Sequence, residues 1–166
     1  MAGEISKTMA QIKPLDEMYR TWAVELIKRE WASPRIITRG KIHDCNKLPG
    51  LISLEDGKPI GLLLYAIEHN ECEIISLNSL LEKKGVGSSL VQAVKDVAEA
   101  AGCSRVWTVT TNDNVAALRF YQKRGFTLVA VYPYALEKSR ILKPEIPTVG
   151  KDGIPLRDEL ELELFL

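Results

Sequence analysis

The first pattern of hydrophobic residues along the chain has helical spacing. Its apolar positions recur at intervals of three and four, at Leu15, Met18, Trp22 and Leu26. Pro14 precedes them and acidic residues occupy the first turn, as is usual where a helix begins. We therefore predict an amphipathic helix that ends at about Glu30, before Ser33 and Pro34.

The pattern then changes to short runs of β-forming residues. These runs cover residues 51–54, 60–68 and 72–78, and only Asp56-Gly57 and His69-Asn70 with their immediate neighbours separate them. Links this short favour hairpins between consecutive strands. The segment is predicted to form an antiparallel meander.

Helical and strand patterns alternate in the next part of the chain. Helical spacing returns at Val86, Leu90, Val94, Val97 and Ala101, and Gly102 closes that helix. Residues 105–110 are typical of a strand, which completes a strand-helix-strand unit with two parallel strands. A third helix is predicted next, with Asn112 or Asp113 as its N-cap and Gly125 as its stop.

The C-terminal part is predicted to add two strands. Residues 126–134 form the first strand, and a proline-containing loop covers residues 143–155. Glutamate and leucine alternate from residue 159 to the end, which predicts a last strand with one solvent-exposed and one buried face. Residues 1–166 are thus expected to form a single α/β domain with one mixed, mostly antiparallel sheet flanked by helices.

Composition and charge exclude several classes of partner. The 166 residues include 22 basic and 22 acidic side chains, and this zero net charge argues against nucleic-acid binding. The longest apolar run, residues 60–67, is far shorter than the roughly 20 residues of a membrane-spanning helix. No secretory signal is apparent, and Cys45, Cys72 and Cys103 lack metal-binding or disulfide spacing, so we expect a cytoplasmic protein without a metal.

A glycine-rich turn, residues 82–89 with the sequence EKKGVGSS, links the third meander strand to the following helix. Glycines at such a position expose backbone N–H groups at a helix N-terminus, where they can bind phosphate. The dinucleotide fingerprint is excluded because Leu90 stands where its third glycine is needed, and the P-loop ending is absent. Taken alone, the turn is as compatible with ordinary turn chemistry as with phosphate binding.

Together with residues 112–126, NDNVAALRFYQKRGF, this turn resembles the GCN5-related N-acetyltransferase (GNAT) superfamily. In that family a Q/R-x-x-G-x-G/A turn binds the pyrophosphate of acetyl-CoA, and an Asn-x-x-Ala-x-x-x-Tyr helix followed by Gly-Phe borders the thioester. The second pattern is matched by Asn114, Ala117, Tyr121, Gly125 and Phe126. The order of elements is similar over nearly the whole chain. One departure is Glu82, which stands where the family has Gln or Arg, and Lys83 and Lys84 can compensate for it.

The resemblance implies an acetyl-CoA site without a metal. Backbone N–H groups of the turn would hold the pyrophosphate, and an N–H group near Leu77 or Leu80 would polarise the acetyl carbonyl. The strands at 73–80 and 105–110 would splay to admit the pantetheine arm. The expected cofactor-binding residues are Leu77, Ser79, Leu80, Lys84, Gly85, Val86, Gly87, Ser88, Ser89, Asn112, Asn114, Ala117 and Tyr121.

Two residues are candidates for proton transfer. The acceptor amine must lose a proton and the departing thiolate must gain one. The resemblance makes Tyr121 the acid and points to Glu73, on the strand before the turn, as the base. The alternatives are that Tyr121 only packs in the core, that Glu73 is an exposed position of an alternating strand, and that Asn114 is a helix cap.

The acceptor is expected to be a primary amine of a small molecule or peptide, acetylated by direct attack in a ternary complex. One wall of its pocket would come from Trp31, Arg35, Arg39, His43 and Asp44, and the other from Tyr132, Tyr134 and residues 143–155. If Arg35 and Arg39 face this pocket, the acceptor would carry a carboxylate.

Two other functions stay open at this point. One is a non-catalytic CoA-binding regulatory or sensor module, which Glu82 favours. The other is a homodimerisation domain in which residues 159–166 form an exposed edge strand and pair between two chains.

Overall fold

The computed structural model describes residues 10–81 and 85–166. Seven strands form one sheet and two more form a separate hairpin. The main sheet contains β1 (Gln11–Pro14), β4 (Gly50–Glu55), β5 (Lys58–Glu68), β6 (Glu71–Ser79), β7 (Arg105–Thr111), β8 (Thr127–Tyr132) and β9 (Glu159–Phe165). The hairpin consists of β2 (Arg35–Thr38) and β3 (Lys41–Asp44). The helices are α1 (Glu17–Trp31), α2 (Val86–Ala100), α3 (Val115–Lys123) and α4 (Ala135–Leu142), and η1 (Lys151–Gly153) is a short 3-10 turn.

The strand order in the main sheet is β1-β4-β5-β6-β7-β9-β8. β4, β5 and β6 form the predicted antiparallel meander, with Asp56-Gly57 and His69-Asn70 at its turns. β6 and β7 are parallel and are joined through α2, as the sequence predicted for a strand-helix-strand unit. The expectation of a mixed, mostly antiparallel α/β sheet is therefore confirmed.

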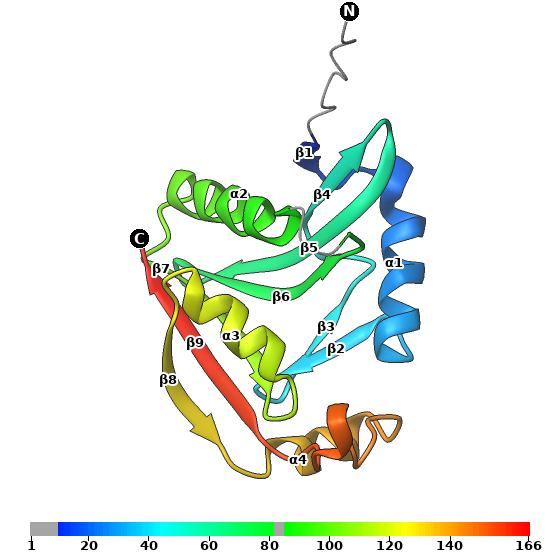
Figure 1. Cartoon of the computed structure of the whole chain (residues 1–166), viewed down its shortest axis with the longest axis vertical. Coiled ribbons are helices and arrows are strands. Elements are labelled where there is room, and N and C mark those ends of the chain that lie inside the picture. Colours follow the sequence, from blue (N-terminus) through cyan, green and yellow to red (C-terminus); the bar gives the residue numbers. More distant parts are fainter. Residues whose placement is uncertain (1–9, 82–84) are drawn as a thin grey trace, which may run out of the picture.

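Helices cover both faces of this sheet (Figure 1). α1 lies on one face, where Ile27 packs against Ile52 and Leu62 of the meander. α2 and α3 lie on the other face, where Leu90 and Tyr121 belong to a second buried cluster. Each helix thus has one apolar side against the sheet, which is the arrangement that its spacing of hydrophobic residues predicts.

β6 and β7 separate partway along their length. Their pairing runs from Glu71 opposite Arg105 to Ile74 opposite Thr108, whereas β6 continues to Ser79 and β7 to Thr111. At the same place the pairing of β6 with β5 shifts register between Leu64 and Tyr65, which marks a β-bulge. The predicted splaying of these strands is therefore present, and the last paired residues lie where the site is formed.

The last strand differs from its prediction. β9 lies between β7 and β8, so its backbone is paired on both sides and it cannot join two chains. Its glutamates are not solvent-exposed either, because Glu159 is only 2% exposed and Glu161 and Glu163 bond Arg105. The neighbouring β8 is the edge strand at this end of the sheet, and its Leu128, Val129 and Val131 are exposed.

Short elements and helix ends were harder to predict. β1, β2, β3 and α4 were not expected, because each has eight residues or fewer and too few positions to show a period. The N-cap of α3 is Asn114, not Asn112 or Asp113, and its side chain accepts a hydrogen bond from the N–H of Ala117. Met18 was assigned to the buried face of α1 but is 79% exposed.

Two features are absent from the residues that the structure describes. None of the helices in residues 10–81 and 85–166 is long and apolar enough to cross a bilayer. In the same ranges, no group of three or more His, Cys, Asp or Glu side chains is placed to hold a metal ion.

Candidate active site

The N-terminus of α2 forms one end of the site. Gly85 precedes the helix with a φ of 70°, a left-handed conformation that glycine adopts without strain, and its carbonyl accepts from the N–H of Ser89. The N–H groups before Ser89 have no acceptor within the helix, and residues 86–89 contain no acidic side chain. Of the predicted residues, Val86, Gly87 and Ser88 thus present free N–H donors that suit an anion, whereas the N–H of Ser89 is bonded to Gly85. Glu82, Lys83 and Lys84 lie outside the described residues.

Arg124 supplies a positive charge beside this helix end. Its Nε donates to Ser88 Oγ at 2.8 Å, its Nη1 donates to the carbonyl of Phe120 at 2.8 Å, and its guanidinium lies 3.6 Å from the centre of the Phe120 ring. Arg124 is not among the site residues that the sequence predicts. Arg124 reaches α2 because α2 and α3 approach each other closely at Gly87. A Cβ added at Gly87 would lie 3.1 Å from the Phe120 side chain of α3.

The separated edge of β6 offers backbone donors. The N–H of Leu80 donates to the carbonyl of Ile60, so it is bonded towards β5 and is not free. Because hydrogen-bond directions alternate along an antiparallel pair, the N–H groups of Leu77 and Ser79 point away from β5, towards the side where β7 has separated. Of the two positions named from the sequence, Leu77 and not Leu80 can therefore polarise a carbonyl placed between the strands.

Tyr121 lies against the last paired residues of β6 and β7. It is 6% exposed, and its ring packs edge-on against the rings of Phe120 and Phe126. The distances between ring centres are 5.2 Å to Phe120 and 5.1 Å to Phe126. Burial raises the pKa of its hydroxyl to about 12, although the neighbouring Thr108 and Arg124 act in the opposite direction. Thr108 also donates to the carbonyl of Ile74, where the ladder ends. Tyr121 is thus fully protonated at neutral pH, as a general acid must be.

The amide of Asn112 is occupied by the chain itself. Its Oδ1 accepts from the N–H groups of Arg157 and Asp158, and its Nδ2 donates to the carbonyl of Pro155. Asn114 Oδ1 accepts from the N–H of Ala117 and from Lys151 Nζ. Both asparagines therefore have structural partners, and Asn112 ties the start of α3 to the segment before β9.

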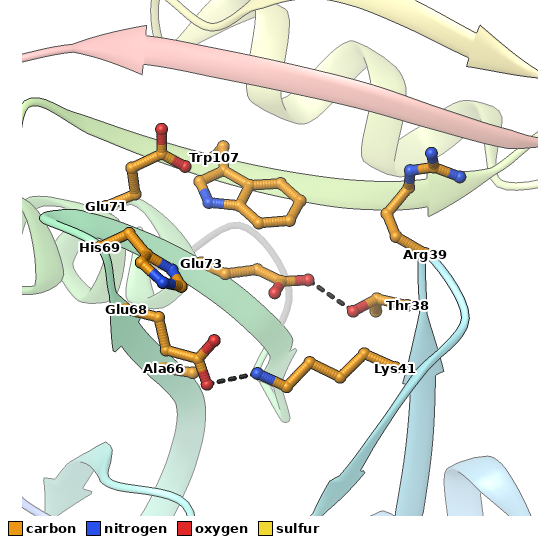
Figure 2. Close-up of a pocket in the computed structure, with 9 residues that line it drawn as sticks. All are labelled: Thr38, Arg39, Lys41, Ala66, Glu68, His69, Glu71, Glu73 and Trp107. Atoms are coloured by element: carbon orange, nitrogen blue, oxygen red, sulfur yellow. Dashed lines mark hydrogen bonds and ion pairs between the residues drawn. The ribbon is translucent and has the colours of Figure 1, made fainter.

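A cavity of about 220 Å³ opens on the other face of the sheet. Its lining comes from the hairpin and from β5, β6 and β7: Thr38, Arg39, Lys41, Ala66, Glu68, His69, Glu71, Glu73 and Trp107. Figure 2 shows Glu73 extending from β6 towards Thr38, with the Trp107 indole of β7 beside it. Glu73 and Trp107 are opposite each other in the β6–β7 pairing and share this face.

Glu73 is buried in this cavity, with 7% exposure, and its Oε1 accepts a 2.6 Å hydrogen bond from Thr38 Oγ1. Burial raises the pKa of its carboxyl to about 7, and Glu159 and Glu161 act in the same direction. Thr38 and Lys41 lower the pKa without cancelling the effect of burial. The alternative of an exposed position on an alternating strand is wrong for Glu73, which is a buried carboxyl poised to exchange a proton near neutral pH.

Other carboxylates around the cavity have basic partners. Glu68 pairs with Lys41, and Arg105 bonds Glu71, Glu161 and Glu163 at 3.0, 3.2 and 2.6 Å. Among the described residues, no lysine or arginine lies within ion-pair distance of Glu73. Glu73 therefore differs from its neighbours in having an unneutralised carboxyl that faces the cavity.

A second cavity of about 340 Å³ adjoins the first at Arg39. The Arg39 guanidinium lies 3.1 Å from the centre of the Tyr132 ring, and its backbone N–H donates to Glu159 Oε2. Of the predicted acceptor wall, Arg39 and Tyr132 line these cavities, whereas Trp31, Arg35, Asp44 and Tyr134 line neither. His43 is buried next to Glu73 and does not line a cavity.

The base candidate Glu73 lies on one face of the sheet, and the acid candidate Tyr121 of α3 packs on the other face. Glu73 faces the cavity, and the next residue, Ile74, packs in the cluster that contains Tyr121. Both lie at the end of the β6–β7 pairing, beyond which the strands have separated. A carbonyl group held between the strands would have a proton acceptor on one side and a proton donor on the other.

Comparisons with known proteins show the family and the fold. The model of the acetyltransferase (GNAT) family matches residues 13–126. The uncharacterized protein YdhI of Bacillus subtilis (strain 168) is 43% identical over 153 residues, which cover 92% of this chain and 96% of YdhI. The crystal structure of a Bacillus subtilis acetyltransferase in complex with CoA superposes with a TM-score of 0.70 at 20% identity, over 95% of this chain and 99% of that chain.

The structure of the "IAA acetyltransferase" from Bacillus cereus ATCC 14579 has the same fold, with a TM-score of 0.70 at 19% identity, over 95% of this chain and 100% of that chain. The resemblance inferred from the two motifs is confirmed by the family match, which covers more than half of the chain. The chain belongs to the GNAT acetyltransferase family.

Proposed function

We propose that the protein transfers the acetyl group of acetyl-CoA to a primary amine of a small molecule or peptide, by direct attack in a ternary complex. The observation that carries this proposal is the position of Glu73 and Tyr121 on opposite faces of the sheet where β6 and β7 separate. A nucleophile entering from the cavity and a thiolate leaving towards α3 need a base and an acid in this arrangement.

The coenzyme would lie between the separated strands with its pyrophosphate at α2. Free N–H groups of residues 86–88 suit the phosphates, and Arg124 adds a guanidinium that can interact with phosphate oxygens. The unpaired N–H groups of Leu77 and Ser79 suit the amide carbonyls of the pantetheine arm and the acetyl carbonyl. The absence of a metal from the proposed chemistry follows from the acetyl thioester, which is already activated for attack by an amine.

Each catalytic residue has one task. Glu73 accepts a proton from the protonated acceptor amine, directly or through a water molecule, and its pKa of about 7 makes both protonation states accessible at neutral pH. The neutral amine attacks the acetyl carbon while the N–H of Leu77 stabilises the developing oxyanion. Tyr121 donates its hydroxyl proton to the departing sulfur. The nitrogen, which became cationic on attack, loses its extra proton, and this proton restores the Tyr121 hydroxyl through solvent. The products are the acetylated amine and free CoA, and Glu73 releases the first proton to solvent.

The test is an acetyl-CoA-dependent thiol-release screen over a panel of amines, with Tyr121→Phe as the variant and Tyr134→Phe, whose side chain is exposed, as the matched control. We expect turnover with at least one amine, a loss of turnover in Tyr121→Phe and unchanged acetyl-CoA affinity. Binding of acetyl-CoA without thiol release from any amine would instead favour a sensor module. Equal rates in Tyr121→Phe and the native protein would remove the acid role.

A further inference from the structure

Three buried side chains from three strands form a chain of hydrogen bonds that ends at Glu73. Thr38 Oγ1 on β2 lies 2.6 Å from Glu73 Oε1 and 2.8 Å from His43 Nε2 on β3. Thr38, His43 and Glu73 are 5%, 4% and 7% exposed. Polar groups buried this deeply need hydrogen-bond partners, and these three supply them to one another. Their hydrogen bonds therefore hold the β2–β3 hairpin against β6.

The direction of the hydrogen bonds follows from counting protons. A hydroxyl carries one proton, and an ionised carboxylate can only accept, so Thr38 donates its proton to Glu73. Thr38 then has no proton for His43, and His43 Nε2 must donate to Thr38 Oγ1. His43 is therefore the Nε2–H tautomer whenever Glu73 is ionised.

The same contacts distinguish the two oxygens of Glu73. Oε1 accepts from Thr38, whereas Oε2 lies 3.8 Å from His43 Nε2, beyond a hydrogen bond. We infer that Thr38 and His43 are positioning residues, which fix Glu73 Oε1 and leave Oε2 as the oxygen that takes the proton from the acceptor amine. This inference rests on the proposed function, because it assigns a role within that reaction.

The nearby Lys41 and Arg105 side chains do not position Glu73, because they are paired with other carboxylates. Lys41 of β3 pairs with Glu68 of β5, and Arg105 of β7 is bonded by Glu71, Glu161 and Glu163. The charge of Glu159 of β9 raises the pKa of Glu73, and the Glu159 carboxylate accepts from the backbone N–H of Arg39. Burial and Lys41 lower the pKa of His43, so it is neutral and acts as a donor and not as a store for the transferred proton.

The test uses the protein without coenzyme or acceptor, so it does not depend on turnover. Protein labelled with ¹³C at the glutamate side-chain carboxyl is titrated by NMR, and Glu73→Gln assigns the Glu73 signal. We expect Thr38→Val, which keeps the shape and removes the hydroxyl, to raise the pKa of Glu73 by about 1, because hydrogen bonds to the carboxylate stabilise its charged form. Thr38→Ser should restore the native value, and Thr127→Val on exposed β8 is the matched control. An unchanged Glu73 pKa in Thr38→Val would overturn the inference.

Substitutions of His43 test the donor assignment separately. His43→Gln keeps an N–H donor at the ε position and should leave the Glu73 pKa near its native value, whereas His43→Leu should raise it. If His43→Gln behaves as His43→Leu does, the donor role is wrong. A measurement on the native protein needs no variant to fold: ¹⁵N shifts of the imidazole at pH 8.5 should show Nε2 protonated and Nδ1 bare, and the reverse pattern would also overturn the inference.

Activity then separates this inference from the proposed function. With an amine that is turned over, Thr38→Val should move the acid limb of the kcat/KM profile to higher pH by the amount seen in the NMR titration. If the native protein acetylates no amine, the proposed function fails, while the NMR results still decide whether Thr38 and His43 position Glu73.

Discussion

The two sides of the β6–β7 separation are built in different ways. The side proposed to bind the coenzyme, called the coenzyme side below, consists of the N-terminus of α2 and the adjoining helix α3, which lie within 40 residues of each other in the chain. The acceptor side brings together the β2–β3 hairpin with β5, β6 and β7, and Arg39 contacts Glu159, which is 120 residues away. One side is local in sequence and the other depends on the whole sheet.

The two sides therefore use different kinds of atoms to contact their ligands. On the coenzyme side most donors are backbone N–H groups, which any sequence with the right turn can provide. On the acceptor side the groups that matter are side chains, and their properties come from burial and from distant partners such as Thr38 for Glu73. A variant on one side should therefore affect acetyl-CoA or the acceptor, but not both.

The largest effect is expected for Glu73→Gln, which keeps the size of the side chain and its ability to accept from Thr38 but removes the base. General-base catalysis is typically worth about 10²–10⁴-fold, so kcat should fall by that range while acetyl-CoA affinity stays unchanged. Steady-state kinetics and calorimetric titration of acetyl-CoA measure the two quantities. Glu30→Gln, exposed on α1, is the control, and native kcat in Glu73→Gln would exclude Glu73 as the base.

Glu73→Gln should lower activity but raise the free energy of unfolding at alkaline pH. The pKa of Glu73 is about 7 in the folded protein against 4.5 in the unfolded chain, so the folded state binds more protons between these values and stability falls as pH rises through them. Above pH 7, ionisation of Glu73 lowers the free energy of unfolding by at most about 3 kcal/mol. Glu73→Gln, which is neutral at every pH, should be more stable than the native protein at pH 8.5 and nearly equal at pH 4.5. Urea unfolding at the two pH values measures the difference, and equal gains at both would contradict the assigned pKa.

The two sides of the site also differ in how far the sequence predicts them. Long periodic segments gave α1, α2 and the meander, and the α2 turn followed from contiguous residues. Four-residue strands such as β2 and β3 have no detectable period, and without them the partners of Glu73 could not be placed. The alternation of Glu and Leu in β9 was read as an exposed edge, because nothing local shows that Arg105 would neutralise Glu161 and Glu163.

Helix ends show the same limit on a smaller scale. Asn112, Asp113 and Asn114 are all good N-cap residues, so the sequence did not identify which one begins α3. The choice of Asn114 is made by the distant segment before β9, which occupies Asn112, and by Lys151, whose N–H bonds Asp113. Arg124 was missed for a related reason, since only the packing of α3 on α2 brings it to Ser88.

A smaller effect is expected on the coenzyme side for Arg124→Gln. Removing one guanidinium beside the α2 N-terminus should weaken acetyl-CoA binding by about tenfold, since a charge-assisted hydrogen bond contributes about 1.5 kcal/mol. KM for the acceptor should stay the same, in contrast to the variants on the other side. Arg119→Gln, on the exposed side of α3, is the control. Unchanged acetyl-CoA affinity would leave the backbone N–H groups of α2 as the phosphate ligands without help from Arg124.

The smallest effect is expected for Arg39→Ala, which tests the acceptor side. The Arg39 guanidinium lies between the two cavities and stacks on Tyr132, and no carboxylate of the described residues forms an ion pair with it. If the acceptor carries a carboxylate, its KM should rise by roughly 3- to 10-fold in Arg39→Ala, with KM for acetyl-CoA unchanged. Arg35→Ala is the matched control, because Arg35 lines neither cavity. An equal acceptor KM in the native protein and Arg39→Ala would exclude recognition of an acceptor carboxylate by Arg39. An increase in KM for acetyl-CoA would show that the two sides of the site are not independent.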